Sequence, residues 1–178
     1  EERITKVTDS VDGVTEYTYD ALGNRISSTT NGVTTTYTVD SNGNVLAEYV
    51  NGKWSRSYYQ GNNLAGWTST DGEYYFNYDV LGSTGSITAG NGSIVNSYNY
   101  DSFGRVTSST ENIANDFEFV GAYGLMSNAS GTTFVRARNY DPVTGRWLSE
   151  DPIGINGGEN LYAYCGNNGI SHVDITGN

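Results

Sequence analysis

Short runs in which hydrophobic and polar residues alternate follow one another along most of the chain. Segments such as TEYTY, TTTYTV and SIVNSYNY are rich in Thr, Tyr and Val. Alternation of these residue types with a period of two is typical of half-buried β-strands. The chain also has 23 Gly and 15 Tyr among 178 residues and little that favours helices. The pattern therefore predicts an all-β protein.

Dipeptides that favour tight turns separate these runs at a regular interval. The glycines of successive Asn-Gly or Asp-Gly pairs lie 19 or 20 residues apart, at Asp12-Gly13, Asn31-Gly32, Asn51-Gly52, Asp71-Gly72 and Asn91-Gly92. Such pairs favour two-residue hairpin turns because both central positions need a positive φ. The interval predicts a meander of antiparallel hairpins of about 20 residues each.

A second kind of turn alternates with the first. It reads Tyr-Asp-x-x-Gly or a variant of it, and it recurs at Asp20, Asp40, Asp79, Asp101 and Asp141, with decayed copies at Gln60 and Val120. The aspartate can accept hydrogen bonds from backbone N–H groups, and we expect a positive φ at Gly23, Gly43, Gly82 and Gly104. We expect equivalent tyrosines to stack from hairpin to hairpin. No D-x-D-x-D-G loop occurs, so no calcium or other metal site is predicted and these aspartates are interpreted as structural.

The last part of the chain has a different character. Both prolines, Pro142 and Pro152, follow an aspartate within the stretch RNYDPVTGRWLSEDPIG. The Tyr-Asp-x-x-Gly repeats resemble the YD repeats of the Rhs family, which includes the C components of insecticidal toxin complexes, wall-associated YD-repeat proteins and teneurins. Residues 134–178 are similar to the C-terminal signature of the Rhs core, which reads R-Y-Y-D-P-x-x-G-R-F-L-S-x-D-P-I-G, then N-x-Y-x-Y-x-x-N-N-P, then D-P-x-G.

The resemblance implies a particular architecture and set of partners. In this family the repeats wind into a spiralling β-shell that encloses a C-terminal polypeptide, usually a toxin, and the signature region plugs one end. On this basis residues 1–133 form a YD-repeat shell segment and residues 134–178 a plug with an autoproteolysis module. The implied partners are the remaining shell of the parent polypeptide and the enclosed toxin or effector, at a secreted or cell-surface location in bacteria. Exposed sheet edges would also allow edge-to-edge self-association.

Many bacterial members of this family cut their own chain just after D-P-x-G by an aspartyl-protease-like reaction that needs no cofactor. Matched residue by residue, the groups that would carry it here are Arg138, Asp151 and Asp174, and the bond cut would follow Asn178. Two carboxylates held close together cannot both ionise, so one can activate water while the other donates a proton. An adjacent arginine can hold one carboxylate ionised or stabilise an oxyanion.

Two departures from the family pattern leave the enzymatic activity open. Ile175 stands where D-P-x-G has proline, and Gly169 stands where N-N-P has proline. In the alternative reading Asp151 and Asp174 only cap turns. The protein would then be a non-cleaving YD-repeat scaffold or adhesion module of a secreted or cell-surface protein.

The net charge, the hydropathy and the single cysteine and histidine argue against several other kinds of protein. A net charge of −11 disfavours nucleic-acid binding, and no apolar run approaches the roughly 18 residues of a membrane span. The chain begins with Glu1 and lacks a signal-peptide pattern, so we interpret it as a piece of a longer polypeptide. We expect structural roles for Cys165 and His172 rather than a nucleophile or proton relay. We also expect Trp147 and Leu148 to anchor the plug, and Arg146 to pair with Asp141 or Glu150.

Overall fold

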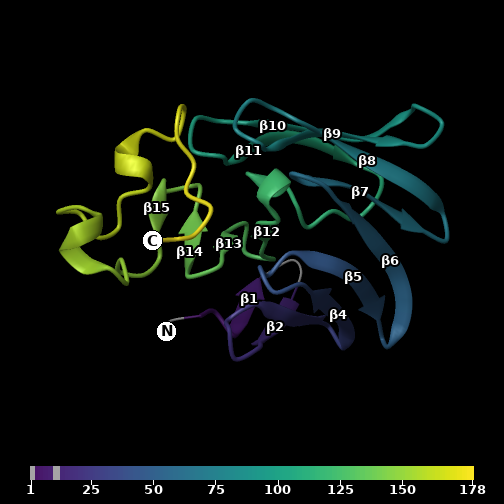
Figure 1. Ribbon diagram of the computed structural model, residues 1–178, viewed down its shortest axis with the longest axis horizontal. Coiled ribbons are helices and arrows are strands. Elements are labelled where there is room, and N and C mark those ends of the chain that lie inside the picture. The colour runs from purple at the N-terminus through teal and green to yellow at the C-terminus, as the bar shows by residue number, and fades with distance from the viewer. Residues whose placement is uncertain (1–2, 10–12) are drawn as a thin grey trace.

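The computed structural model describes residues 3–9 and 13–178, and most of the ordered elements are strands (Figure 1). Eleven strands form one antiparallel sheet in which every strand pairs with its neighbours along the chain. The predicted continuous hairpin meander is therefore confirmed. Its strands are β1 Lys6–Asp9, β2 Gly13–Tyr19, β3 Arg25–Thr30, β4 Val33–Val39, β5 Val45–Val50, β6 Lys53–Gln60, β7 Leu64–Ser69, β8 Gly72–Tyr78, β9 Thr84–Ala89, β10 Ile94–Tyr100 and β11 Val106–Glu111.

The sheet is strongly curved. In Figure 1 it runs from β1, β2, β4 and β5 along the lower side, through β6, to β8–β11 along the upper side. A four-stranded antiparallel sheet follows it in the chain, made of β12 Met126–Ser127, β13 Thr133–Val135, β14 Arg138–Asp141 and β15 Arg146–Trp147. Three short 3-10 turns complete the fold: η1 Gly121–Tyr123, η2 Gly154–Gly157 and η3 Cys165–Asn167. Among the described residues we find no helix with the length and apolar character needed to span a membrane.

The Asn-Gly and Asp-Gly turns follow the prediction in two of the four described cases. Asn31 and Gly32 have φ values of 51° and 81°, and Asn51 and Gly52 have 48° and 76°, as a two-residue turn with two positive φ angles requires. Asp71-Gly72 differs because Gly72 already pairs with Ser69, which leaves Thr70 and Asp71 at the centre of the turn. At Asn91-Gly92 the Gly92 N–H donates to the Ala89 carbonyl, so Gly90 and Asn91 are central. Asp12 lies outside the described residues.

The Tyr-Asp turns have the predicted geometry. Gly23, Gly43, Gly82 and Gly104 all have φ between 82° and 88°. In the first of these turns, Asp20 Oδ1 accepts hydrogen bonds from the backbone N–H groups of Leu22 and Asn24 at 2.9 and 2.8 Å. The same pair of bonds recurs at Asp40, Asp79 and Asp101. These aspartates therefore act as turn caps, as the sequence predicts.

Where a tyrosine precedes the turn aspartate of the large sheet, its hydroxyl group links the hairpin to the preceding part of the chain. The hydroxyl groups of Tyr19, Tyr78 and Tyr100 donate to the backbone carbonyls of Ile4, Leu64 and Thr84 at 2.6, 2.5 and 2.9 Å. Gln60 makes the same link with its side-chain amide, which donates to Val45 O at 2.8 Å. Gln60 thus occupies the place of the tyrosine rather than of the aspartate, one residue away from the predicted phase.

A row of aromatic residues from alternate strands lines the core of the curved sheet. Its members are Tyr17, Tyr37, Tyr58, Phe76 and Tyr98, all of them buried. Residues of the intervening strands, such as Trp67, lie between them, with ring centroids 6.2 Å from Tyr58 and 5.2 Å from Phe76. Within the described part of the chain, no ring contact joins Tyr17 to Tyr37 or Tyr37 to Tyr58. The expectation of direct stacking between equivalent tyrosines is therefore wrong, because a strand separates them.

After β11 the chain leaves the large sheet and enters its curve. We call residues 112–125 the crossover segment. Phe117 packs against Tyr58 and Phe76 at centroid distances of 5.3 and 6.3 Å, which closes the first core. Val120 has a φ of 54° but precedes η1 instead of a hairpin turn, so the predicted decayed repeat at this position is wrong. The crossover segment is thereby fixed between the large sheet and the C-terminal part.

A second core supports the C-terminal part of the chain. Its buried members are Phe119, Val120, Leu125, Val135, Tyr140, Trp147 and Tyr164. The rings of Tyr140 and Tyr164 lie 4.1 Å apart, and Trp147 packs edge-on against both at 5.6 and 5.5 Å. Trp147 therefore anchors this region as predicted, whereas Leu148 is 50% exposed and does not.

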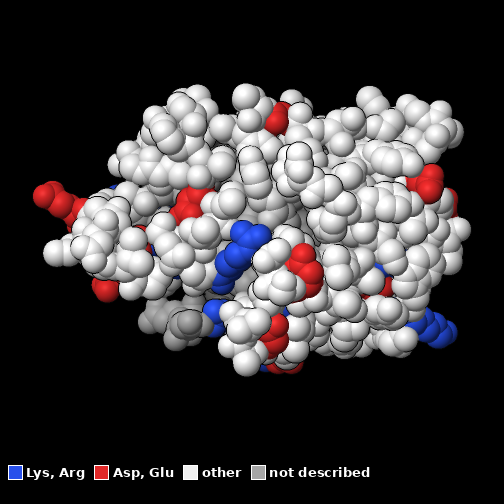
Figure 2. Space-filling view, viewed as in Figure 1, with Lys and Arg blue, Asp and Glu red and all other residues white. Residues whose placement is uncertain are grey.

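Figure 2 shows a face on which uncharged side chains dominate and Lys and Arg form only small groups.

Candidate functional site

Arg138 occupies the centre of the C-terminal region. It begins β14, and its side chain is only 3% exposed because it lies against the second core. The guanidinium carbon is 4.2 Å from the centre of the Trp147 ring, a distance at which a cation is attracted to the ring face. Burial lowers the pKa of Arg138, while the neighbouring charges of Asp151 and Asp174 act to raise it. A buried arginine requires partners for its donors.

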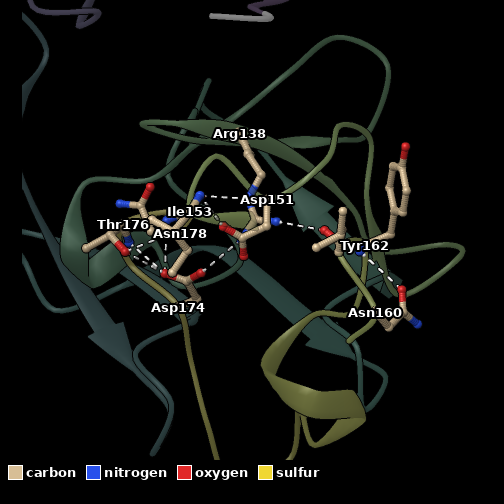
Figure 3. A network of polar contacts seen from close by, with 10 residues as sticks. Arg138, Asp151, Ile153, Asn160, Tyr162, Asp174, Thr176 and Asn178 are labelled. Atoms are coloured by element: carbon tan, nitrogen blue, oxygen red, sulfur yellow. Dashed lines mark hydrogen bonds and ion pairs between the residues drawn. The ribbon is translucent and has the colours of Figure 1, made fainter. Parts of the chain in front are cut away.

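Those partners include both predicted aspartates (Figure 3). Arg138 Nη2 donates to Asp151 Oδ2 at 3.0 Å and lies 3.9 Å from Asp174 Oδ2. Its Nε donates to the carbonyl of Gly177 at 2.6 Å, and Nη1 donates to the carbonyl of Leu161 at 3.1 Å. One guanidinium therefore brings together two carboxylates from distant turns and the backbone directly before Asn178.

Each carboxylate also caps a turn with its other oxygen. Asp151 Oδ1 accepts the Ile153 N–H at 3.0 Å. Asp174 Oδ1 accepts the N–H groups of Thr176 and Gly177, both at 2.9 Å. The capping role of the alternative reading and the pairing with Arg138 thus exist together, on different oxygens of the same side chains.

Gly157 is a site residue that sequence reasoning missed. A Cβ on Gly157 would lie 2.6 Å from Asp151 Oδ2 and 3.0 Å from its Cγ, so no larger residue fits without moving the carboxylate. The Leu161 carbonyl was missed as well. The Gly157-Gly158 pair in GINGGEN is the only sequence signal for this contact, and a glycine pair by itself does not indicate which side chain approaches it.

Two cavities meet at this group of residues. One, of about 490 Å³, is lined by Arg138, Asp151, Asp174, His172, Cys165 and Asn178 among others. The second, of about 580 Å³, has Arg138, Asp151 and Asn178 in its wall together with Leu148 and Tyr162. The first leaves room for water beside both carboxylates and Asn178, and the second beside Asp151 and Asn178. A hydrolytic reaction would need that access.

Cys165 and His172 line the first cavity. Burial raises the pKa of the Cys165 thiol to about 11, so the thiol is protonated near neutral pH and is a poor nucleophile. In the part of the chain that the structure describes, no group of three or more His, Cys, Asp or Glu residues is placed to hold a metal ion.

The predicted ion pair of Arg146 is not formed. Among the described residues, Arg146 pairs with neither Asp141 nor Glu150, so the prediction is wrong.

The two departures from the family pattern have different structural settings. A Cβ on Gly169 would lie 2.8 Å from the carbonyl oxygen of Ser102, so the glycine allows a close approach that proline would not. Ile175 is half-buried and packs against the second core. Its amide donates no hydrogen bond among the described residues. With both departures present, Arg138 Nη2 lies 3.0 Å from Asp151 Oδ2 and 3.9 Å from Asp174 Oδ2.

Comparison with known proteins relates most of the chain to YD-repeat proteins. A profile described as the teneurin YD-shell matches residues 49–167, and an RHS repeat profile matches residues 3–34. The chain is 32% identical over 172 residues, 90% of its length, to the tRNA3(Ser)-specific nuclease WapA of Bacillus spizizenii. It is 32% identical over 109 residues, 59% of its length, to toxin subunit YenC1 of Yersinia entomophaga.

A solved structure has the same fold. The crystal structure of TcdB2-TccC3-TEV matches 98% of the chain with a TM-score of 0.73 and 18% identity, which at this identity relates the folds alone. The chain spans only a small part of each of these proteins: 7% of WapA, 11% of YenC1 and 9% of the chain in the crystal structure.

Proposed function

Because the chain belongs to the YD-shell family, we propose that it is the C-terminal part of a shell that encloses a toxin or effector polypeptide, and that it cuts the parent chain after Asn178. Residues 1–133 are the shell segment and residues 134–178 the plug that carries the cutting site. Its partners are the rest of the shell and the enclosed polypeptide, at a secreted or bacterial cell-surface location. WapA, named as a nuclease, and YenC1, named as a toxin subunit, support a toxin-related role.

The observation that carries the cutting activity is the contact of one guanidinium with both aspartates and the Gly177 carbonyl. In the proposed reaction, one carboxylate takes a proton from water, and the water oxygen attacks the carbonyl carbon of Asn178. The other carboxyl group, in its protonated form, donates a proton to the leaving amine as the C–N bond breaks. Arg138 holds the two carboxylates and the preceding carbonyl in place, and covalent attachment of the substrate supplies proximity.

The test is intact-mass measurement on a chain that continues past Asn178. We expect the wild type to split after Asn178, whereas Asp151→Asn and Asp174→Asn stay whole while folding normally. Asparagine keeps the size and most hydrogen bonds of aspartate but cannot exchange the proton. Asp79→Asn is the matched control, since Asp79 caps a turn far along the chain from this site, and it should split like the wild type. Equal splitting of all four chains would overturn the assignment.

One observation favours a second function. Asp151 Oδ1 and Asp174 Oδ1 each accept the backbone N–H two residues on, as the caps of the repeat turns do. If those caps are their whole role, the protein is a non-cleaving scaffold or adhesion module of a secreted or cell-surface protein. A longer wild-type chain that stays intact would support this function.

A further inference from the structure

Three consecutive residues donate hydrogen bonds to three consecutive carbonyl groups near the end of the chain. Arg136 Nη1 donates to the carbonyl of Ile175, and the Ala137 backbone N–H donates to that of Thr176 at 3.2 Å. Arg138 Nε donates to the Gly177 carbonyl at 2.6 Å. The register is one to one, with two guanidinium groups and one backbone N–H each donating to one carbonyl of the turn that Asp174 caps.

The donor side is held in a conformation that serves these contacts. Arg136 has a φ of 43°, a left-handed value that is unfavourable for a residue with a long side chain. Its guanidinium also donates to the carbonyl of Tyr123 at 3.3 Å, which fixes the side chain against the crossover segment. Strain of this kind persists only where the surroundings require it, and here the strained residue directs a donor to Ile175.

The space around residues 175–177, whose carbonyl groups accept these hydrogen bonds, limits which side chains can occupy each position. Gly177 is buried and has a φ of 76°, and a Cβ on it would lie 2.5 Å from Val135 O and 2.9 Å from Arg138 N. Ile175 packs against the second core, whereas the side chain of Thr176 is exposed. The contacts with residues 135–138 thus require glycine at the third position and favour an apolar residue at the first, whereas, among the described residues, the Thr176 hydroxyl bonds only to Asp174 and Asn178 of its own segment.

We propose that residues 136–138 form a peptide-binding clamp whose ligand is a short segment of the type apolar–any–glycine, recognised by its carbonyl groups. The clamp binds residues 175–177 whether or not the bond after Asn178 is cut. A cut chain then keeps its new end bound beside Asp151 and Arg138, so the site is occupied by its own product and does not act on a second chain. This extends the proposed function to substrate recognition, but the binding itself does not depend on cleavage.

Amide hydrogen exchange at Ala137, followed by NMR in the full chain, tests the clamp. The Ala137 N–H is protected only while it donates to Thr176 O. We expect Gly177→Ala to accelerate its exchange about tenfold or more, because local opening becomes easier. Gly131→Ala is the matched control: Gly131 has a φ of 74° and nothing within 4 Å of its Cβ position, so it introduces backbone strain without a clash. Unchanged exchange in Gly177→Ala, or equal acceleration in both variants, would overturn the clamp.

A second variant covers the case in which Gly177→Ala does not fold. Arg136→Gly removes the donor to Ile175 and at the same time relieves the positive φ, which glycine adopts readily. We expect faster Ala137 exchange without an equivalent loss of thermal stability. Ala137 exchange as slow as in the wild type would contradict the clamp. Self-cleavage is measured separately, by the intact mass of a longer chain. A longer chain that stays whole would contradict self-cleavage, but it would not affect the conclusion that the exchange measurement gives for the clamp.

Discussion

At the scale of single residues, Gly157 sets the position of the Asp151 carboxylate. Asp151 accepts from Ile153 N with one oxygen and from Arg138 with the other, and the backbone of Gly157 closes the remaining side of the carboxylate. A methyl group there would overlap Oδ2. The candidate site therefore depends on a residue that carries no functional group.

We predict that Gly157→Ala separates Asp151 from Arg138 and slows self-cleavage of a longer chain about tenfold or more, since small displacements of a reacting group have large effects on rate. The measurements are the distance from Asp151 Oδ2 to Arg138 Nη2, now 3.0 Å, in a structure of the variant, and the cleavage rate. Gly154→Ala serves as the control, because Gly154 has a φ of 63° with nothing near its Cβ position. It should reduce stability but leave the rate unchanged; the opposite ranking would disprove the role of Gly157.

At the scale of elements, the repeating turns were predictable because their signals are local. A Tyr-Asp-x-x-Gly stretch contains both the cap and the residue with positive φ, so Asp20 and Gly23 could be assigned from a few neighbouring letters. The crossover segment was missed because Phe117 and Phe119 lie in an irregular stretch without periodic alternation. The contacts of Gly157 and Gly177 join residues far apart in the chain, and no local pattern records them. Arg138, Asp151 and Asp174 were found only through the family resemblance.

We predict that replacing the turn glycines with valine destabilises the sheet by about 1 kcal/mol or more each, because a β-branched residue is strained at positive φ. For a chain of this size that lowers the melting temperature by roughly 2–4 °C per kcal/mol. Gly104→Val should cost more than Gly43→Val. A Cβ at Gly104 would meet the buried Phe119 ring at 2.3 Å, whereas at Gly43 it would meet only the end of the smaller Asn24 side chain, at 2.5 Å. Thermal melts in which the turn variants match the wild type would refute this account of the turns.

At the scale of the whole molecule, Glu48 of the large sheet is buried and Glu118 of the crossover segment is half-buried. Glu48 is 5% exposed, accepts a hydrogen bond from the Tyr58 hydroxyl and lies 3.4 Å from Arg56 Nε. Burial, with a smaller contribution from the charge of Asp116, raises the pKa of Glu48 to about 7. Burial, followed by the charge of Glu111, likewise raises the pKa of Glu118 to about 7.

The sign of the pH dependence follows from these values. The folded protein favours neutral Glu48 and Glu118, while the unfolded chain ionises them near pH 4.5. Their contribution to stability is therefore complete below about pH 4.5 and is lost as the pH rises towards about 7. We predict a lower urea midpoint at pH 7.5 than at pH 5, and a smaller difference in Glu48→Gln. The exposed Glu16→Gln is the control and should keep the wild-type difference. A Glu48→Gln protein with the full wild-type difference would contradict this assignment.

We propose that the Arg138 site cuts its own chain after Asn178, and the decisive experiment is to measure how the rate of that cut depends on protein concentration. A longer wild-type chain, unfolded in denaturant and refolded by dilution, is followed by intact mass over about a hundredfold range of protein concentration. We expect a first-order rate constant that is the same at every concentration, with a single break after Asn178, because the scissile bond belongs to the chain that cuts it. A rate constant that rises in proportion to concentration, a break at another bond, or a chain that stays whole would contradict it.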